Sequence, residues 1–237
     1  MSEEPASGVN WRGQPLGGVL FDLDGTLLDT ASDIARALNR ALAEREIAAF
    51  PVNEVIRMVG RGSPVLIERA AAARRRTLPE SERAAILERF FHYYGELEER
   101  GESEAAPYPG AAEALRRLHE AGARIAVVTN KHHRFASALM HGLNLSPWID
   151  LIVGGDTCEL RKPDPQPLLF ACKSLGLTPS ETLMVGDSIN DVGAARAAQI
   201  PIICVPYGYN EGRDPRTLDC DAMVETLAEL PALLNCP

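Results

Sequence analysis

The sequence predicts an α/β fold: a doubly wound parallel-sheet core with an inserted all-helical cap subdomain. Short apolar runs rich in β-branched residues recur along the chain, and segments of helical periodicity separate most of them. That alternation is typical of a parallel sheet whose strands are buried on both faces. A much longer stretch, residues 32–104, separates the first two runs and exceeds what one crossover needs. We therefore expect a separate helical unit inserted into the core.

Five apolar runs are the expected strands of the core. Each is followed closely by Gly, Asp, Thr or Pro, residues that end strands and begin turns. The runs cover residues 18–22, 124–129, 150–154, 182–186 and 201–205. Helical patterns lie between most of them, over residues 111–121, 134–143, 167–175 and 191–198. This succession produces parallel neighbours and puts the carboxyl ends of the strands at one edge of the sheet.

The inserted segment is predicted to be helical. Ile34, Leu38 and Leu42 share one helix face, as do Ile86 and Phe90 further along the chain. Gly, Pro and acidic residues near both ends of the segment supply hinges. We expect a flexible N-terminal segment over residues 1–15, a catalytic core made of residues 16–31 and 105–237, and a cap made of residues 32–104.

The composition is that of a globular protein with an acidic balance. Of 237 residues, 46% are hydrophobic, and 24 Lys plus Arg stand against 33 Asp plus Glu, a formal charge of -9. This charge argues against binding of nucleic acid or of an anionic membrane surface, and no apolar run approaches membrane-spanning length. To bind a small anionic substrate, a protein with this net charge would need positively charged side chains at the binding site. The polar first residues lack a leader pattern, so we expect a cytoplasmic protein, as a monomer or homodimer.

The five cysteines predict neither a disulfide framework nor a zinc site. They are odd in number and include no C-x-x-C pair, which is typical of reduced thiols. Cys158, Cys172 and Cys204 are expected to be small core residues rather than nucleophiles.

The sharpest functional signal follows the first expected strand. Asp22 and Asp24 are two residues apart, so strand alternation puts both carboxylates on one side, where open α/β sheets bind ligands. Gly25 permits a sharp turn directly after them, and Thr26 follows. Paired carboxylates repel each other unless a cation or proton intervenes, and Mg²⁺ prefers oxygen ligands. We expect a Mg²⁺ site here, although this motif alone also fits a metal-free strand and turn.

Three further segments place polar side chains after later strands. Thr129 and Asn130 offer a hydroxyl and an amide suited to phosphoryl oxygens, and Lys162 offers a cation stiffened by nearby prolines. Asp187 and Asp191 offer two more carboxylates. Each segment alone has a plainer interpretation, such as a helix N-cap for Thr129 and Asn130 or a solvated surface side chain for Lys162. Together they predict an acid, a metal, a hydroxyl and a cation at one edge of the sheet.

These four motifs, in this order, resemble those of the haloacid dehalogenase superfamily, and the resemblance runs from Gly18 to about Leu234. It implies a core like the superfamily's with a helical cap inserted after the first motif. Asp22 would be the nucleophile that attacks phosphorus. Asp24, oriented by Thr26, would be the general acid for the leaving alkoxide and then the base for water.

The resemblance also implies how phosphate and metal are held. Thr129 and the Asn130 amide would bind the phosphoryl oxygens, and Lys162 would offset charge on the phosphate and the nucleophile. Mg²⁺ would be held by Asp22, the backbone carbonyl of Asp24 and Asp187, with Asp191 behind them. These roles suit phosphoryl transfer, which depends chiefly on positioning and on neutralising oxygen charge.

Details narrow the expected reaction to hydrolysis of a small phosphate monoester. Asp24 favours phosphatases and phosphomutases over dehalogenases, and residues 29–33 lack the histidine that β-phosphoglucomutases typically carry there. Residues 128–131, 154–156 and 207–212 resemble phosphoglycolate phosphatases, which implies 2-phosphoglycolate as the first substrate to test. The alternatives are another small phosphate such as N-acetylmuramate 6-phosphate, a sugar phosphomutase, or a binding protein that lost turnover.

One cap residue is a further candidate for substrate binding. Arg61 lies in a turn between two glycines, where its guanidinium could pair with a substrate carboxylate. The plainer interpretation is an exposed turn arginine. His132 and His133 follow the second motif, and we expect them to be surface or helix-cap residues.

Overall fold

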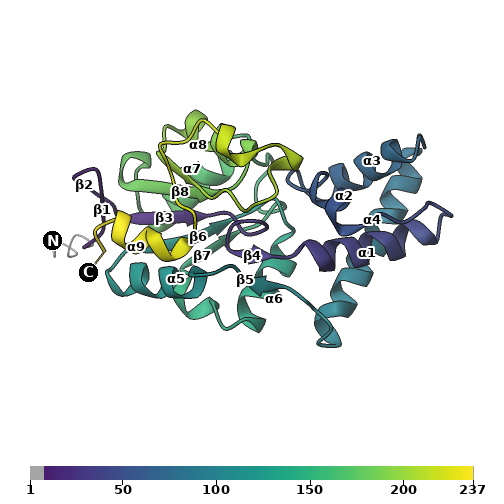
Figure 1. Cartoon of the computed structure of the whole chain (residues 1–237), viewed down its shortest axis with the longest axis horizontal. Coiled ribbons are helices and arrows are strands. Elements are labelled where there is room, and N and C mark those ends of the chain that lie inside the picture. The colour runs from purple at the N-terminus through teal and green to yellow at the C-terminus, as the bar shows by residue number, and fades with distance from the viewer. Residues whose placement is uncertain (1–7, 237) are drawn as a thin grey trace.

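The computed structural model describes residues 8–236 and has a six-stranded parallel sheet at its centre (Figure 1). β3 (Gly18–Phe21) lies between β8 (Thr182–Gly186) and β6 (Arg124–Val128). β7 (Leu151–Val153) continues the sheet on one side, and β9 (Ile202–Cys204) and β10 (Ala222–Met223) continue it on the other. The predicted doubly wound sheet and its five strands are confirmed. The sequence missed β10, because a two-residue strand carries no periodicity.

Alternating side chains of β3 serve two separate hydrophobic cores. Val19 and Phe21 belong to a cluster that includes residues of α5 (Ala111–Glu120), α6 (His133–Gly142) and α9 (Leu230–Leu233). Leu20 belongs to a cluster that includes residues of α7 (Gln166–Leu175) and α8 (Ile189–Ala198). Helices therefore cover both faces of the sheet, which explains why its strands are continuously apolar.

The inserted segment forms a helical layer beside the core, at the right of Figure 1. Its helices are α1 (Ala31–Ala43), α2 (Val52–Ile56), α3 (Ser63–Ala73) and α4 (Glu80–Glu99). They fall within the predicted cap, residues 32–104, except for the first residue of α1. Their buried side chains form a third cluster, which Phe135 and Tyr209 of the core join. The cap and the core therefore pack against each other.

A short two-stranded ribbon carries the chain into and out of the cap. β4 (Leu28–Asp29) pairs antiparallel with β5 (Ala106–Pro107). Beyond the ribbon, the Asp33 carboxylate accepts hydrogen bonds from the Ser103 hydroxyl at 2.5 Å and the Glu104 backbone N–H at 2.9 Å. The two segments that connect the core to the cap are thus held side by side.

The predicted flexible N-terminal segment is wrong for its second half. β1 (Asn10–Trp11) and β2 (Gln14–Pro15) form a hairpin, and the Asn10 backbone N–H donates to the Leu234 carbonyl. Val9 and Trp11 are buried in the core, so apolar contacts order this segment. Residues 1–7 lie outside the described part of the chain. No helix within residues 8–236 has the length and apolar character needed to cross a membrane.

Candidate active site

The predicted site residues gather where the central strands end. Asp22 directly follows β3, Thr129 follows β6 and Asp187 follows β8, at the point where the strand order reverses. A cavity, which we call the cap–core cavity, lies between this edge and the cap. The core lines it with the residues Asp22, Asp24, Thr129, Asn130, Lys131, Phe135, Lys162, Asp187, Ser188, Asn190, Asp191, Tyr209 and Asn210. The cap contributes the residues Ile34, Val59, Gly60, Gly62, Ser63, Leu66, Phe90 and Tyr94.

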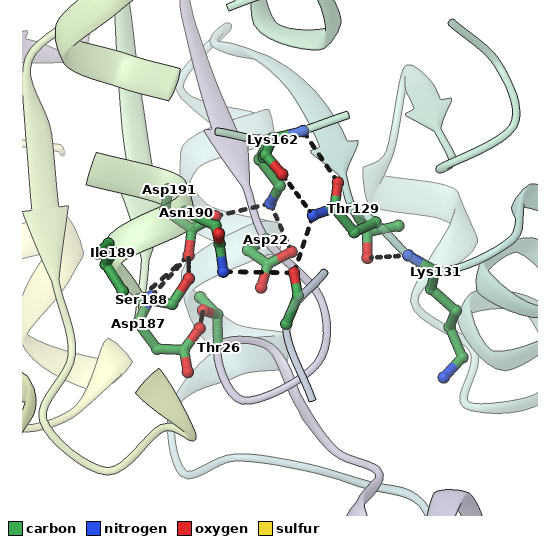
Figure 2. Close-up of polar contacts among 12 residues, drawn as sticks. Asp22, Thr26, Thr129, Lys131, Lys162, Asp187, Ser188, Ile189, Asn190 and Asp191 are labelled. Carbon is green, nitrogen blue, oxygen red and sulfur yellow. Dashed lines mark hydrogen bonds and ion pairs between the residues drawn. The ribbon is translucent and has the colours of Figure 1, made fainter. Parts of the chain in front are cut away.

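Lys162 is buried between two carboxylates, which excludes the surface interpretation. Its Nζ lies 2.7 Å from Asp22 Oδ1 and 2.6 Å from Asp191 Oδ1 (Figure 2). Burial lowers the pKa of Lys162, but the carboxylates of Asp191 and Asp22 outweigh burial and raise it above its ordinary value. The Lys162 side chain is therefore a fixed positive charge beside Asp22.

Three buried carboxylates form a group that could hold a metal ion. Asp22, Asp187 and Asp191 each offer an oxygen, and these atoms lie within 4.8 Å of one another. Burial raises the pKa of Asp22 to about 7, with Lys162 acting against it. Burial and the nearby carboxylates of Asp191 and Asp22 also raise the pKa of Asp187. Closely spaced buried oxygen ligands with this excess of negative charge fit a hard divalent cation such as Mg²⁺.

Asp191 is the most engaged of the three carboxylates. Its Oδ1 contacts Lys162, and its Oδ2 accepts hydrogen bonds from the Ser188 backbone N–H and hydroxyl at 3.1 and 2.6 Å. Asp187 is held by a different loop, because its Oδ2 accepts hydrogen bonds from the backbone N–H groups of Tyr209 and Asn210. Asp191 is therefore placed to support Lys162 and the turn that carries Asp187.

The side chain of Asp24 is held apart from the other carboxylates. Its Oδ1 accepts hydrogen bonds from Lys131 Nζ at 2.9 Å and from the Thr30 hydroxyl at 2.5 Å. The prediction that Thr26 orients Asp24 is wrong. Thr26 is fully buried and donates to Asp187 Oδ1 at 3.3 Å. The turn at Gly25 brings Asp187 close, since a Cβ there would lie 2.6 Å from Asp187 Oδ2.

Asn130 positions the chain around Lys162 instead of offering a free side-chain amide. Its Oδ1 accepts from the Lys162 backbone N–H at 3.0 Å, and its Nδ2 donates to the carbonyls of Lys162 and Gly60, both at 2.8 Å. The expectation that this side-chain amide binds phosphoryl oxygens is therefore wrong, and its backbone N–H is the amide that remains. The neighbouring Thr129 hydroxyl oxygen accepts from the Lys131 backbone N–H, and this hydroxyl keeps a proton to donate.

Arg61 joins the cap to the core and does not line the cap–core cavity. Its Nε donates to Glu211 Oε1 at 2.9 Å, and its side chain is 42% exposed. Glu211 Oε1 also lies 3.0 Å from Arg69 Nη2 and 3.3 Å from Asn190 Nδ2. The predicted projection of Arg61 into the cleft is wrong, because an acidic side chain of the core holds its guanidinium at the rim.

Sequence reasoning missed Lys131 as a residue of the cavity. Its ammonium pairs with Asp24 and lies 4.5 Å from the centre of the Tyr94 ring. The available signal was a cation directly after Thr129 and Asn130, at the end of a predicted strand. His132 occupies the N-cap position of α6, and within residues 8–236 neither it nor His133 lines the cavity.

The cap, the sheet topology and the carboxylates around Lys162 together define a hydrolase class. Residues 16–199 match the family of haloacid dehalogenase-like hydrolases, so the chain belongs to that family. The chain is 42% identical to phosphoglycolate phosphatase of Nitrosospira multiformis, over 93% of this chain and 96% of that protein. It is 39% identical to phosphoglycolate phosphatase of Thiobacillus denitrificans over the same shares.

Solved structures agree with this assignment. A protein from Haemophilus somnus, described as a predicted phosphoglycolate phosphatase, superposes with a TM-score of 0.85 and 30% identity, over 92% of this chain and 97% of that one. CbbY from Rhodobacter sphaeroides, solved with phosphate, gives a TM-score of 0.78 at 26% identity, over 93% and 99%.

Proposed function

We propose that the chain is a Mg²⁺-dependent phosphatase that hydrolyses 2-phosphoglycolate to glycolate and phosphate. The observation that carries the proposal is the position of Asp22, a buried carboxylate next to Lys162 and within reach of Asp187. Within residues 8–236, Oδ1 of Asp22 accepts the hydrogen bond from Lys162, and Oδ2 accepts none. That second oxygen is the one we assign as the nucleophile.

The residues divide the reaction into two displacements at phosphorus. In the first, Asp22 attacks phosphorus, the bond to the glycolate oxygen breaks, and Asp24 gives that oxygen a proton. In the second, water attacks the aspartyl phosphate while Asp24 takes a proton from it. Phosphate leaves, and the Asp22 carboxylate is restored. Asp24 suits both steps because Thr30 and Lys131 hold its carboxyl group in one orientation.

Positive charge and donors around the phosphate come from several elements. Lys162 neutralises charge beside Asp22, and the Thr129 hydroxyl and the Asn130 backbone N–H are the proposed donors to phosphoryl oxygens. Bound Mg²⁺ would offset charge on the phosphoryl group. Its proposed ligands are the carboxylates of Asp22 and Asp187 and the backbone carbonyl of Asp24.

The choice of 2-phosphoglycolate rests on the relatives and on the enclosed site. Both curated relatives described above are named for that activity. Phe90, Tyr94 and Leu66 of the cap line the same cavity as the catalytic aspartates, which suits a small substrate. The cytoplasmic location and the monomeric or dimeric state stay predictions.

Initial rates of phosphate release with Mg²⁺ test the proposal. The substrates are 2-phosphoglycolate, N-acetylmuramate 6-phosphate and β-glucose 1-phosphate. We expect the highest kcat/KM for 2-phosphoglycolate. A higher value for either sugar phosphate, or movement of phosphate within a sugar without release, would refute the proposed activity.

A further inference from the structure

We propose that Lys131 determines substrate specificity by pairing with a carboxylate that lies one carbon from the phosphate ester oxygen. This assignment rests on the proposed function and names the group of the substrate that the cavity recognises. It replaces Arg61, the residue that the sequence had suggested for this role.

The backbone around Lys131 is fixed at the end of β6. The Lys131 N–H donates to the Thr129 hydroxyl oxygen at 3.1 Å, and the Lys131 carbonyl accepts from the Gly155 N–H at 2.7 Å. The side chain is 7% exposed. A lysine held in this way presents its charge at one place in the cavity.

The two lysines that line the cavity contact different carboxylates at different ends of the cavity. Figure 2 shows Lys162 directed at Asp22 and Asp191, whereas Lys131 points away from that group. Lys162 already contacts two carboxylates at the phosphoryl end. Lys131 contacts the carboxylate of Asp24, and an ammonium carries three N–H donors, so donors remain for a second anion.

The surroundings of Lys131 make its charge selective. The centre of the Tyr94 ring lies 4.5 Å from Nζ, and the rings of Phe90 and Phe135, which also line the cavity, contact Tyr94. Little water can share such a space, and attraction between opposite charges is stronger there than in solvent. A substrate with a neutral group at this position would gain much less binding free energy from Lys131.

The covalent geometry of the substrate matches the position of Lys131. Asp24 is the proposed proton donor to the ester oxygen, and Lys131 contacts the same Asp24 side chain at 2.9 Å. In 2-phosphoglycolate one methylene separates the ester oxygen from the carboxyl carbon. An ammonium that contacts Asp24 is therefore within reach of that carboxylate. Arg61 is paired with Glu211 at the rim.

The test compares 2-phosphoglycolate with 2-phosphoglycolamide, which has the same shape but no carboxylate charge. In Lys131→Met we expect the ratio of kcat/KM for the acid over the amide to fall about 10- to 100-fold, the scale of a lost charged hydrogen bond. Damage to Asp24 affects both substrates and cancels in the ratio. Lys131→Arg keeps the charge and should keep part of the preference. Lys131→Gln replaces Lys131→Met if that variant does not fold.

Two controls make the result specific to this residue. Lys173→Met makes the same change on the exposed surface of α7 and should leave the ratio unchanged. Arg61→Met should change both substrates by the same factor. An unchanged ratio in Lys131→Met, with a wild type that hydrolyses 2-phosphoglycolate, would overturn the assignment. A wild type without turnover of 2-phosphoglycolate would overturn the proposed function, and this assignment with it, so wild-type rates separate the two failures.

Discussion

The Thr30 hydroxyl donates a 2.5 Å hydrogen bond to Asp24 Oδ1, next to the point where the chain leaves the core for the cap. Thr30 precedes the first residue of α1, and its backbone N–H donates to the Tyr209 hydroxyl. The orientation of the proposed general acid thus depends on the residue that directly precedes the first helix of the cap.

Thr30→Val should slow turnover, because valine keeps the shape of threonine but donates no hydrogen bond to Asp24. We expect kcat to fall by about 10-fold, the scale of one lost hydrogen bond to a charged group. Thr30→Ser keeps the hydroxyl and should stay close to wild type. Steady-state rates at saturating Mg²⁺ measure both variants. A wild-type kcat in Thr30→Val would show that Lys131 alone orients Asp24.

Asp22→Asn should abolish turnover of every phosphate ester, because an amide does not attack phosphorus. The fold should persist, since the two side chains are close in size and shape. Circular dichroism and thermal unfolding check the fold, and phosphate release checks the rate. Near-wild-type turnover by the folded variant would exclude an aspartyl phosphate on Asp22.

Asp187→Ala should raise the Mg²⁺ concentration needed for half the maximal rate. We expect an increase of about 10-fold or more from the loss of a carboxylate ligand. Thr26→Val removes the hydrogen bond to Asp187 Oδ1 and should give a smaller shift in the same direction. A Mg²⁺ titration identical to wild type would remove Asp187 from the proposed metal ligands.

The stability of the metal-free protein should fall as pH rises from about 4 to about 7. Burial raises the pKa of Asp22 from 3.8 to about 7, and the pKa of Asp187 moves in the same direction. Between these values the folded state binds more protons than the unfolded state, so the free energy of unfolding decreases with pH. Mg²⁺ binds the deprotonated carboxylates, so the stabilisation it provides should increase over the same range.

Thermal unfolding with a chelator and with excess Mg²⁺ measures this dependence. The rise in Tm caused by Mg²⁺ should be larger at about pH 7.5 than at about pH 5. Equal rises at the two pH values would mean that Mg²⁺ does not displace protons from these carboxylates.

Glu211→Gln should weaken the attachment of the cap to the core. Glu211 is 7% exposed and contacts both Arg61 and Arg69, so the variant leaves two cations without their charged partner. We expect faster amide hydrogen exchange over residues 57–69 and an equal loss of kcat/KM for 2-phosphoglycolate and its amide. Glu225→Gln is the matched control, because Glu225 pairs with Arg216 on the exposed surface. Unchanged exchange in Glu211→Gln would contradict this role.

The sequence was sufficient for the core sheet because its strands are buried on both faces. Continuous apolar runs such as residues 182–186 are recognisable without neighbours. β10 and the β1–β2 hairpin were not recognisable, because strands of two residues have no period and depend on tertiary contacts. Trp11 illustrates this, since its burial follows from the core that it covers.

The sequence predicted which core-motif residues form the site, but not which hydrogen-bond and ion-pair partners they have. Asp22 and Asp187 directly follow β3 and β8, so their convergence follows from parallel topology, whereas the long loop between β7 and α7 brings Lys162 to them. The partner of Arg61 is 150 residues away, and the packing of the cap against the core selects it. Similarly, the turn at Gly25 directs Thr26 to Asp187 and leaves Asp24 to Thr30, which no spacing rule indicates.

The β4–β5 ribbon determines which parts of the cavity move when the cap moves. Two hydrogen-bonded strands bend together more readily than they slide, so we expect a rotation of the cap to occur about this ribbon. The ribbon lies one turn away from Asp24, the proposed general acid. The N–H of Gly25, the residue after Asp24, donates to the carbonyl of Leu28 in β4. α3 lies far from the ribbon in Figure 1, so a rotation about the ribbon would displace α3 much more than Asp24. Such a rotation would leave Asp24 nearly stationary, so substrate access could change at the far end of the cap while the hydrogen bond from Thr30 to Asp24 is kept.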